Sequence, residues 1–303
     1  MQASRAKTDH GLILGFALAA FGTMILPIGD AIAKHLGALD YHVFQIVWGR
    51  WATHLVILAP IFLLRRPRGA LIPERTGLHT LRALVMLAAT AAYFFALRFM
   101  PLADAAAILF CAPLIVTALS GLVLGERVGP RRWVAVVVGL CGMLLIVRPG
   151  LGAMNWGAPF ALLATLSFAC YFLLTRKLAG RTPPVVTLWY MAVVGTAAST
   201  PMALAVWRMP NAEVWLLMFG IGAVMALGHL LIIRGLDHIE ASAMAPLTYL
   251  EIVTATLVGY LWFGDFPDAL TWTGCAVVIG AGLFVIYRER LAAAQAARST
   301  TPI

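Results

Sequence analysis

Two ionisable side chains, Arg50 and Glu251, lie deep inside long apolar runs of this sequence. Arg50 comes nine residues after Tyr41, and Glu251 comes eleven residues after Glu240. In helices these positions are about 14 Å and about 16 Å from the ends of their runs. A charge in hydrocarbon is unfavourable unless it is paired or hydrated, so both residues are candidates for a functional site.

Two interpretations of this pair are open. Arg50 and Glu251 either pair with each other as a structural lock, or a zwitterionic substrate comes between them during part of a transport cycle. A second pair of opposite charges, Asp30 and Lys34, is one helical turn apart near the end of the first run. We expect these two to neutralise each other as a structural pair.

Aromatic and polar residues within the runs could complete a cavity around a molecule with an apolar side chain. Ordinary helix packing is the alternative for each of them, and the inward histidine His54 is expected to be a hydrogen-bonded packing residue rather than a ligand. The candidate wall residues are Trp48, Tyr93, Tyr171, Trp189, His229 and Tyr249, and the candidates for neutral hydrogen bonds are Gln45 and Ser242.

The sequence lacks the motifs of several other classes of protein. No G-x-x-x-x-G-K-[ST] phosphate loop, H-E-x-x-H metal motif or G-x-S-x-G nucleophile motif occurs. The four cysteines lie singly in apolar runs, without a C-x-x-C pair, and are expected to pack as small apolar residues. We therefore expect neither an enzyme nor an ATP-driven pump, and no metal or cofactor.

Composition identifies the elements that position these residues. The chain is 62% hydrophobic and 12% charged over 303 residues, which is typical of a polytopic membrane protein. The apolar runs are continuous rather than alternating, so they predict helices and not barrel strands. We predict ten transmembrane helices near 11–33, 41–64, 81–98, 102–124, 131–148, 156–178, 185–207, 212–234, 240–263 and 269–287.

Lysine and arginine predict the orientation of these helices. Seventeen of these residues, Arg82 among them, fall on the side of the N-terminus, against four on the opposite side: Lys34, Arg98, Arg148 and Arg208. Both termini are therefore expected in the cytoplasm. The net charge of +9 follows from these loops and requires no nucleic acid.

The two halves of the chain echo each other. Gly125-Glu126 recurs as Gly264-Asp265, 139 residues later, and other short matches recur in the same order at similar offsets. Each half then holds five helices, so the second copy must enter the membrane from the opposite side. We expect an all-α membrane protein of two inverted five-helix repeats, over residues 11–150 and 151–290. That arrangement is typical of secondary transporters.

Ten helices as five plus five, an arginine in the second run and an apolar run closing on "LGE" resemble the EamA-type transporters of the drug/metabolite transporter superfamily. The stretch "YLEIVTATLVGYLWFGD" (249–265) is similar to the matching part of that family's second repeat. Ile252 stands where the family often has proline, and Asp265 replaces the usual glutamate. Whether the ninth run bends is therefore open.

The resemblance implies a secondary carrier, often an exporter, in the inner membrane of a bacterium, with a small-molecule substrate and the lipid bilayer as partners. Amino acids, including aromatic and apolar ones, are the expected substrates, since the aromatic amino acid exporters of this superfamily are similar in length and aromatic content. Riboflavin, a nucleotide sugar or a drug are alternatives, and a channel or a sensor built on a carrier scaffold is another.

Overall fold

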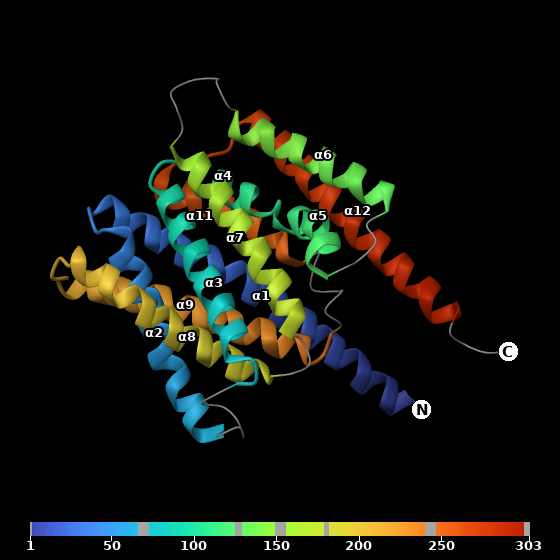
Figure 1. Ribbon diagram of the computed structural model, residues 1–303, viewed down its shortest axis with the longest axis horizontal. Coiled ribbons are helices and arrows are strands. Elements are labelled where there is room, and N and C mark those ends of the chain that lie inside the picture. Colours follow the sequence, from blue (N-terminus) through green and yellow to red (C-terminus); the bar gives the residue numbers. More distant parts are fainter. Residues whose placement is uncertain are drawn as a thin grey trace.

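Long stretches of apolar residues with few charges form helices in the computed structural model (Figure 1). The structure describes residues 2–65, 73–124, 129–148, 156–178, 182–239 and 247–299, and no strand occurs in these ranges. The helices are α1 (Gln2–Ala38), α2 (Val43–Arg65), α3 (Thr76–Leu97), α4 (Leu102–Leu109), α5 (Ala112–Leu124), α6 (Pro130–Val147), α7 (Gly157–Leu178), α8 (Pro184–Ala205), α9 (Ala212–Leu236), α11 (Leu250–Phe263) and α12 (Ala269–Ser299).

The prediction of an all-helical membrane protein is confirmed, and its number of ten spans stays a prediction. In the described ranges, nine helical segments are long and apolar enough to cross a membrane, and the shorter apolar α11 accompanies them. The start of α1 and the end of α12 project on the same side of the bundle (Figure 1). We call this the terminal end and the opposite one the far end. The predicted boundary at Gly125-Glu126 and the start of the ninth run lie outside the described residues.

The fourth predicted helix is interrupted. It ends at Leu109 and starts again at Ala112, so α4 and α5 together make one apolar span. Pro113 explains the interruption, because it has no N–H for the carbonyl of Leu109. A second interruption lies at Tyr249, directly before α11 begins. The regular helix therefore breaks at Tyr249, whose φ of −68° and ψ of −15° stay in the right-handed helical region, although Ile252 stands where proline was expected.

The prediction for the third helix was wrong at its first turns. The helix begins at Thr76 rather than near residue 81, so Arg82 lies in the second turn of α3 and not at its start. Only 3% of Arg82 is exposed, and its guanidinium packs against α7. It remains near the terminal end, so the side to which its charge was assigned is unchanged.

Packing joins the first half of the chain to the second. The closest neighbours are α1 with α9, α3 with α7, and α6 with α12, and α2 lies against both α8 and α9 (Figure 1). In the predicted repeat, α1 corresponds to α7 and α3 corresponds to α9. The α1–α9 packing of one half with the other therefore corresponds to the α7–α3 packing. The α6–α12 and α2–α8 packings map onto themselves. Two related halves would produce this pattern, and the result is one interdigitated bundle.

Candidate functional site

The interior of the bundle holds a charged cluster around Arg50. Only 6% of Arg50 on α2 and 6% of Asp30 on α1 are exposed, and Asp30 is close enough for its charge to act on the guanidinium. Arg50 Nη1 donates a hydrogen bond of 3.2 Å to Thr90 Oγ1 on α3. The guanidinium lies 5.7 Å from the Phe94 ring centre. The sequence prediction that Arg50 is buried is confirmed.

Glu251 lies in the first turn of α11, beside the interruption at Tyr249. Its carboxyl is near that of Asp30, and both charges act on the buried Tyr93 of α3. Within the described ranges, Arg50 and Glu251 form no ion pair shorter than 4.0 Å. A direct lock between them is therefore not present in this conformation, and Asp30 is the acid that acts on Arg50.

The expected pairing of Asp30 with Lys34 was wrong. Lys34 Nζ instead lies 2.6 Å from Asp265 Oδ2, in the loop after α11. The helical spacing of Asp30 and Lys34 suggested a local pair, but the two side chains take part in different tertiary contacts. Asp30 therefore belongs to the charged cluster around Arg50 and not to a pair with Lys34.

Two histidines adjoin the cluster. The rings of His54 on α2 and His229 on α9 are 5.9 Å apart between centres. His229 Nδ1 is 2.7 Å from the carbonyl oxygen of Met225, so Nδ1 carries the proton that is donated. Neither ring nitrogen of His54 has a partner in the described part of the chain. The prediction that His54 is a hydrogen-bonded packing residue is therefore wrong for its hydrogen bonds.

The two interrupted helices meet at their interruptions. The rings of Phe110, between α4 and α5, and of Tyr249, before α11, are 5.4 Å apart. These positions are 139 residues apart, the same offset as in the sequence repeat. Thr165 on α7 donates to the carbonyl of Ile108, 3.2 Å away, close to the first interruption. Interrupted helices near the middle of the membrane are a common feature of substrate sites in carriers.

Three predicted site residues lie away from this centre. Gln45 bonds to the backbone of Arg208 through both its amide atoms, at 2.7 Å and 3.1 Å. Trp48 Nε1 donates to Thr200 Oγ1, 3.1 Å away, near the far end. Trp189 stacks on Phe62 at 4.4 Å, toward the terminal end.

Trp48 and Trp189 therefore do not flank one centre. Trp189 and Thr200 are separated by eleven positions of α8, or about 16 Å along the helix. Tyr171 takes part in a contact at the terminal end, described next. Ser242 lies outside the described residues.

Polar contacts join the helices at the terminal end. Arg82 donates to the Tyr171 hydroxyl at 2.8 Å and to Thr175 Oγ1 at 2.7 Å. The hydroxyls of Thr80 and Tyr190 are 2.9 Å apart, which connects α3 to α8. These bonds fasten α3 to its two neighbours from the second half.

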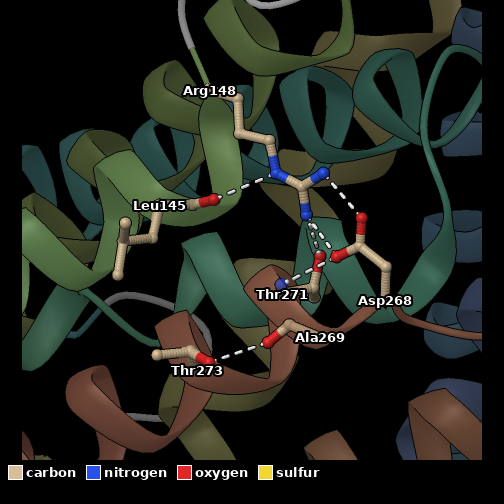
Figure 2. A network of polar contacts seen from close by, with 6 residues as sticks. All are labelled: Leu145, Arg148, Asp268, Ala269, Thr271 and Thr273. Carbon is tan, nitrogen blue, oxygen red and sulfur yellow. Dashed lines mark hydrogen bonds and ion pairs between the residues drawn. The ribbon is translucent and has the colours of Figure 1, made fainter.

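The far end is fastened by ion pairs. Figure 2 shows Arg148, after α6, bonding through two nitrogens to the carboxylate of Asp268, before α12. Asp268 also accepts a bond of 2.9 Å from the backbone N–H of Thr271, so it caps α12. The bonds from Arg148 hold the pKa of Asp268 well below its usual value of 3.8, and they raise the pKa of Arg148. With the Lys34–Asp265 pair, these contacts connect helices of both halves.

Sequence reasoning missed Thr90, Trp51 and the roles of Asp30 and His54 in the interior. For His54 the sequence did contain a signal. It follows Arg50 by four residues, so both side chains project from the same side of α2. In the described residues, no group of three or more histidine, cysteine, aspartate or glutamate side chains could hold a metal ion.

An interdigitated helical bundle with buried charges at its centre and interrupted helices beside them defines a membrane carrier. Residues 12–148 and 155–288 each match the EamA-like transporter family, so the chain belongs to that family. It is a small-metabolite transporter and not an enzyme.

Relatives with named substrates agree with this class. The chain is 29% identical to an S-adenosylmethionine uptake transporter of Rickettsia prowazekii, over 87% of this chain and 89% of the relative. It is 29% identical to a riboflavin transporter of Vibrio cholerae (79% and 81%) and to a pseudopaline exporter of Pseudomonas aeruginosa (88% and 94%). A solved crystal structure aligns with a TM-score of 0.63 at 19% identity, over 90% of this chain and 96% of its own, and shows the same fold.

Proposed function

We propose that this chain is a secondary carrier with alternating access that exports amino acids, including aromatic and apolar ones. The observation that supports this proposal most is the charged cluster of Arg50, Asp30 and Glu251. It offers a cation for a carboxylate and two acids for an ammonium group, from helices of both halves. Tyr93 and His229 adjoin it and supply aromatic surface, and Tyr249 packs against Phe110 at the interruptions.

One relative has a substrate that supports a zwitterionic substrate class for this chain. S-adenosylmethionine carries an α-amino acid group together with an aromatic ring, and a Rickettsia uptake transporter of this compound aligns over most of the chain. Uptake of a substituted amino acid is therefore the second candidate function. Riboflavin, a nucleotide sugar and a drug are the alternative substrates. A channel and a sensor are the alternative functions.

The proposal includes an architecture and an orientation. Residues 11–150 and 151–290 form two inverted five-helix repeats, which the exchange of helix packings between the halves supports. Both termini face the cytoplasm of a bacterium, with the protein in the inner membrane, as the distribution of lysine and arginine supports.

The decisive experiment is counterflow in proteoliposomes that contain the purified full chain. Each solute of a panel is added outside in labelled form, with the same unlabelled solute inside the proteoliposomes. The panel contains amino acids, S-adenosylmethionine, riboflavin and a nucleotide sugar. Saturable exchange of an amino acid supports the proposal. Exchange of riboflavin or a nucleotide sugar alone would contradict the substrate class, and unsaturable flux would favour a channel.

A charge exchange tests the two roles left open for Arg50 and Glu251. Arg50→Ala and Glu251→Ala are each expected to abolish counterflow. The double variant Arg50→Glu with Glu251→Arg should stay inactive if the substrate binds between the two charges. The carboxylate and the ammonium group of the substrate are in fixed places and would then face like charges. Recovery of transport in the double variant would instead indicate a structural lock that forms in another conformation. Normal transport by both alanine variants would remove these residues from the mechanism.

A further inference from the structure

Three neighbouring side chains of α2 carry buried polar atoms without partners. Arg50 Nε, Trp51 Nε1 and both ring nitrogens of His54 have no hydrogen-bond partner in the described part of the chain. Trp51 is 1% exposed and His54 is 2% exposed, so bulk water does not reach them. Buried polar groups are nearly always paired, and several orphaned atoms on one helix face indicate a missing ligand or bound water.

These side chains form a continuous strip. The Arg50 guanidinium lies 5.3 Å from the Trp51 ring centre, and the Trp51 and His54 rings are stacked 6.0 Å apart. His54 in turn is 5.9 Å from His229 on α9. The strip therefore runs across the middle of the bundle from the charged cluster to α9.

The strip is distinct from the surface cavity on α2. That cavity, of about 370 Å³, is lined by Trp48, Thr53 and Val56, together with Trp215 and Phe219 of α9. These α2 positions lie on the opposite side of the helix from Arg50, Trp51 and His54. Val56 and Phe219 are exposed, so the cavity opens on the outer surface of the bundle.

The strip offers mostly donors, so it favours a ligand that accepts hydrogen bonds, and one ring nitrogen of a neutral His54 can itself accept. Arg Nε and the indole N–H only donate, and a neutral imidazole donates through one of its nitrogens. A carboxylate has two oxygens with about four acceptor positions, and charge-assisted bonds to it are strong. Asp30 already acts on Arg50, so an anion without a cation of its own would add uncompensated negative charge. A zwitterion avoids this, because its ammonium group can be accepted by Asp30 or Glu251.

We propose that Arg50, Trp51 and His54 together bind the carboxylate of the transported molecule, and that Trp51 and His54 determine the preference for a carboxylate over a neutral group. This inference rests on the proposed function, since it assigns one end of an amino acid to one helix face. It adds Trp51 and His54 to the site residues that were predicted from the sequence.

The test compares amino acids with their amides on the purified full chain. Stabilisation against heat is measured with L-phenylalanine, L-methionine and their carboxamides, over a range of concentrations. We expect the wild type to bind the acids at least about tenfold more tightly than the amides. In Trp51→Phe and His54→Phe the ratio should fall to about threefold or less.

Controls separate loss of recognition from loss of structure. Trp215→Phe makes the same replacement at the exposed cavity on α9 and should keep the wild-type ratio. His54→Gln restores a donor and should recover more of the preference for acids over amides than His54→Phe. It replaces His54→Phe as the test variant if that protein does not fold.

Each other outcome has a distinct meaning. An unchanged ratio in Trp51→Phe and His54→Gln, with the wild type preferring the acids, would overturn the assignment and leave the proposed function intact. Equal binding of acids and amides, or equal stabilisation by inorganic phosphate, would overturn carboxylate recognition. Stabilisation by riboflavin and by none of the amino acids would overturn the proposed function and this inference together.

Discussion

At the scale of single residues, burial was easier to predict than partnership. The depth of Arg50 follows from its place in an apolar run, and the structure agrees. The partner of Lys34 does not follow in this way, because Asp265 lies 231 residues away and only the tertiary fold joins them. Local helical spacing favoured Asp30 instead. Trp189 was likewise assigned to the centre by repeat symmetry, although its ring stacks on Phe62.

One prediction at this scale concerns the pH dependence of stability. The pKa of Asp268 is lowered in the folded chain by its bonds to Arg148. The contribution of this charge is therefore fully present above the unfolded pKa of about 3.9 and is lost as the pH falls toward the folded value. Asp268→Asn should lower the melting temperature of the detergent-solubilised protein by a constant amount between about pH 5 and pH 7. The difference from wild type should shrink below about pH 4.

A second variant separates the charge from the helix cap. Asp268→Asn keeps an acceptor for the Thr271 N–H, whereas Asp268→Ala removes it and should cost about 1 kcal/mol more. If the asparagine variant and wild type differ equally at every pH, the ion pair with Arg148 has no role in stability.

At the scale of helices, composition was sufficient to predict that the helices exist. It was not sufficient to predict where they end or where they are interrupted. The apolar runs match the observed spans closely, since each needs only enough length to cross the membrane. The start of α3 was predicted a few residues late, because Arg82 was counted as a charge at the end of its run, while in the fold its guanidinium bonds to Tyr171 and Thr175. The interruption at Tyr249 could not be predicted at all, because the proline that would indicate it is absent at position 252.

A prediction at this scale concerns the contact between α1 and α9. A methyl group added at Gly22 would lie 2.8 Å from the carbonyl oxygen of Gly228, and backbone cannot move away as a side chain can. Gly22→Ala should therefore destabilise the protein by about 1–3 kcal/mol, measured by thermal unfolding in detergent. Gly280→Ala is the matched control, because nothing lies within 4 Å of a methyl group there. Equal stability of the two variants would mean that α1 and α9 are not closely packed in solution.

At the scale of the whole molecule, the distribution of charge between the two sides makes a prediction about orientation. Seventeen lysines and arginines against four predict that both termini lie in the cytoplasm. A C-terminal fusion to a reporter that is active only in the cytoplasm should be active, and a fusion to one active only outside should be silent. The opposite result would reverse the assignment of the terminal end.

Charge balance in the interior makes the second prediction at this scale. The cluster holds two acids, Asp30 and Glu251, around a single guanidinium, so it carries excess negative charge when both acids are ionised, and a proton or a cation would neutralise this charge. We expect transport in proteoliposomes to respond to an imposed pH step, and Asp30→Asn to abolish that response. Transport that is indifferent to a pH step and to ionophores would identify a facilitator.

The close approach of Gly22 and Gly228 also matters while the chain is being made. Gly22 leaves the ribosome about 200 residues before its partner, which at about 5–20 residues per second is a delay of roughly 10–40 s. During that time the glycine surface of α1 has only lipid or an insertion factor beside it. A nascent chain that stops before α9 is complete lacks the principal neighbour of its first helix.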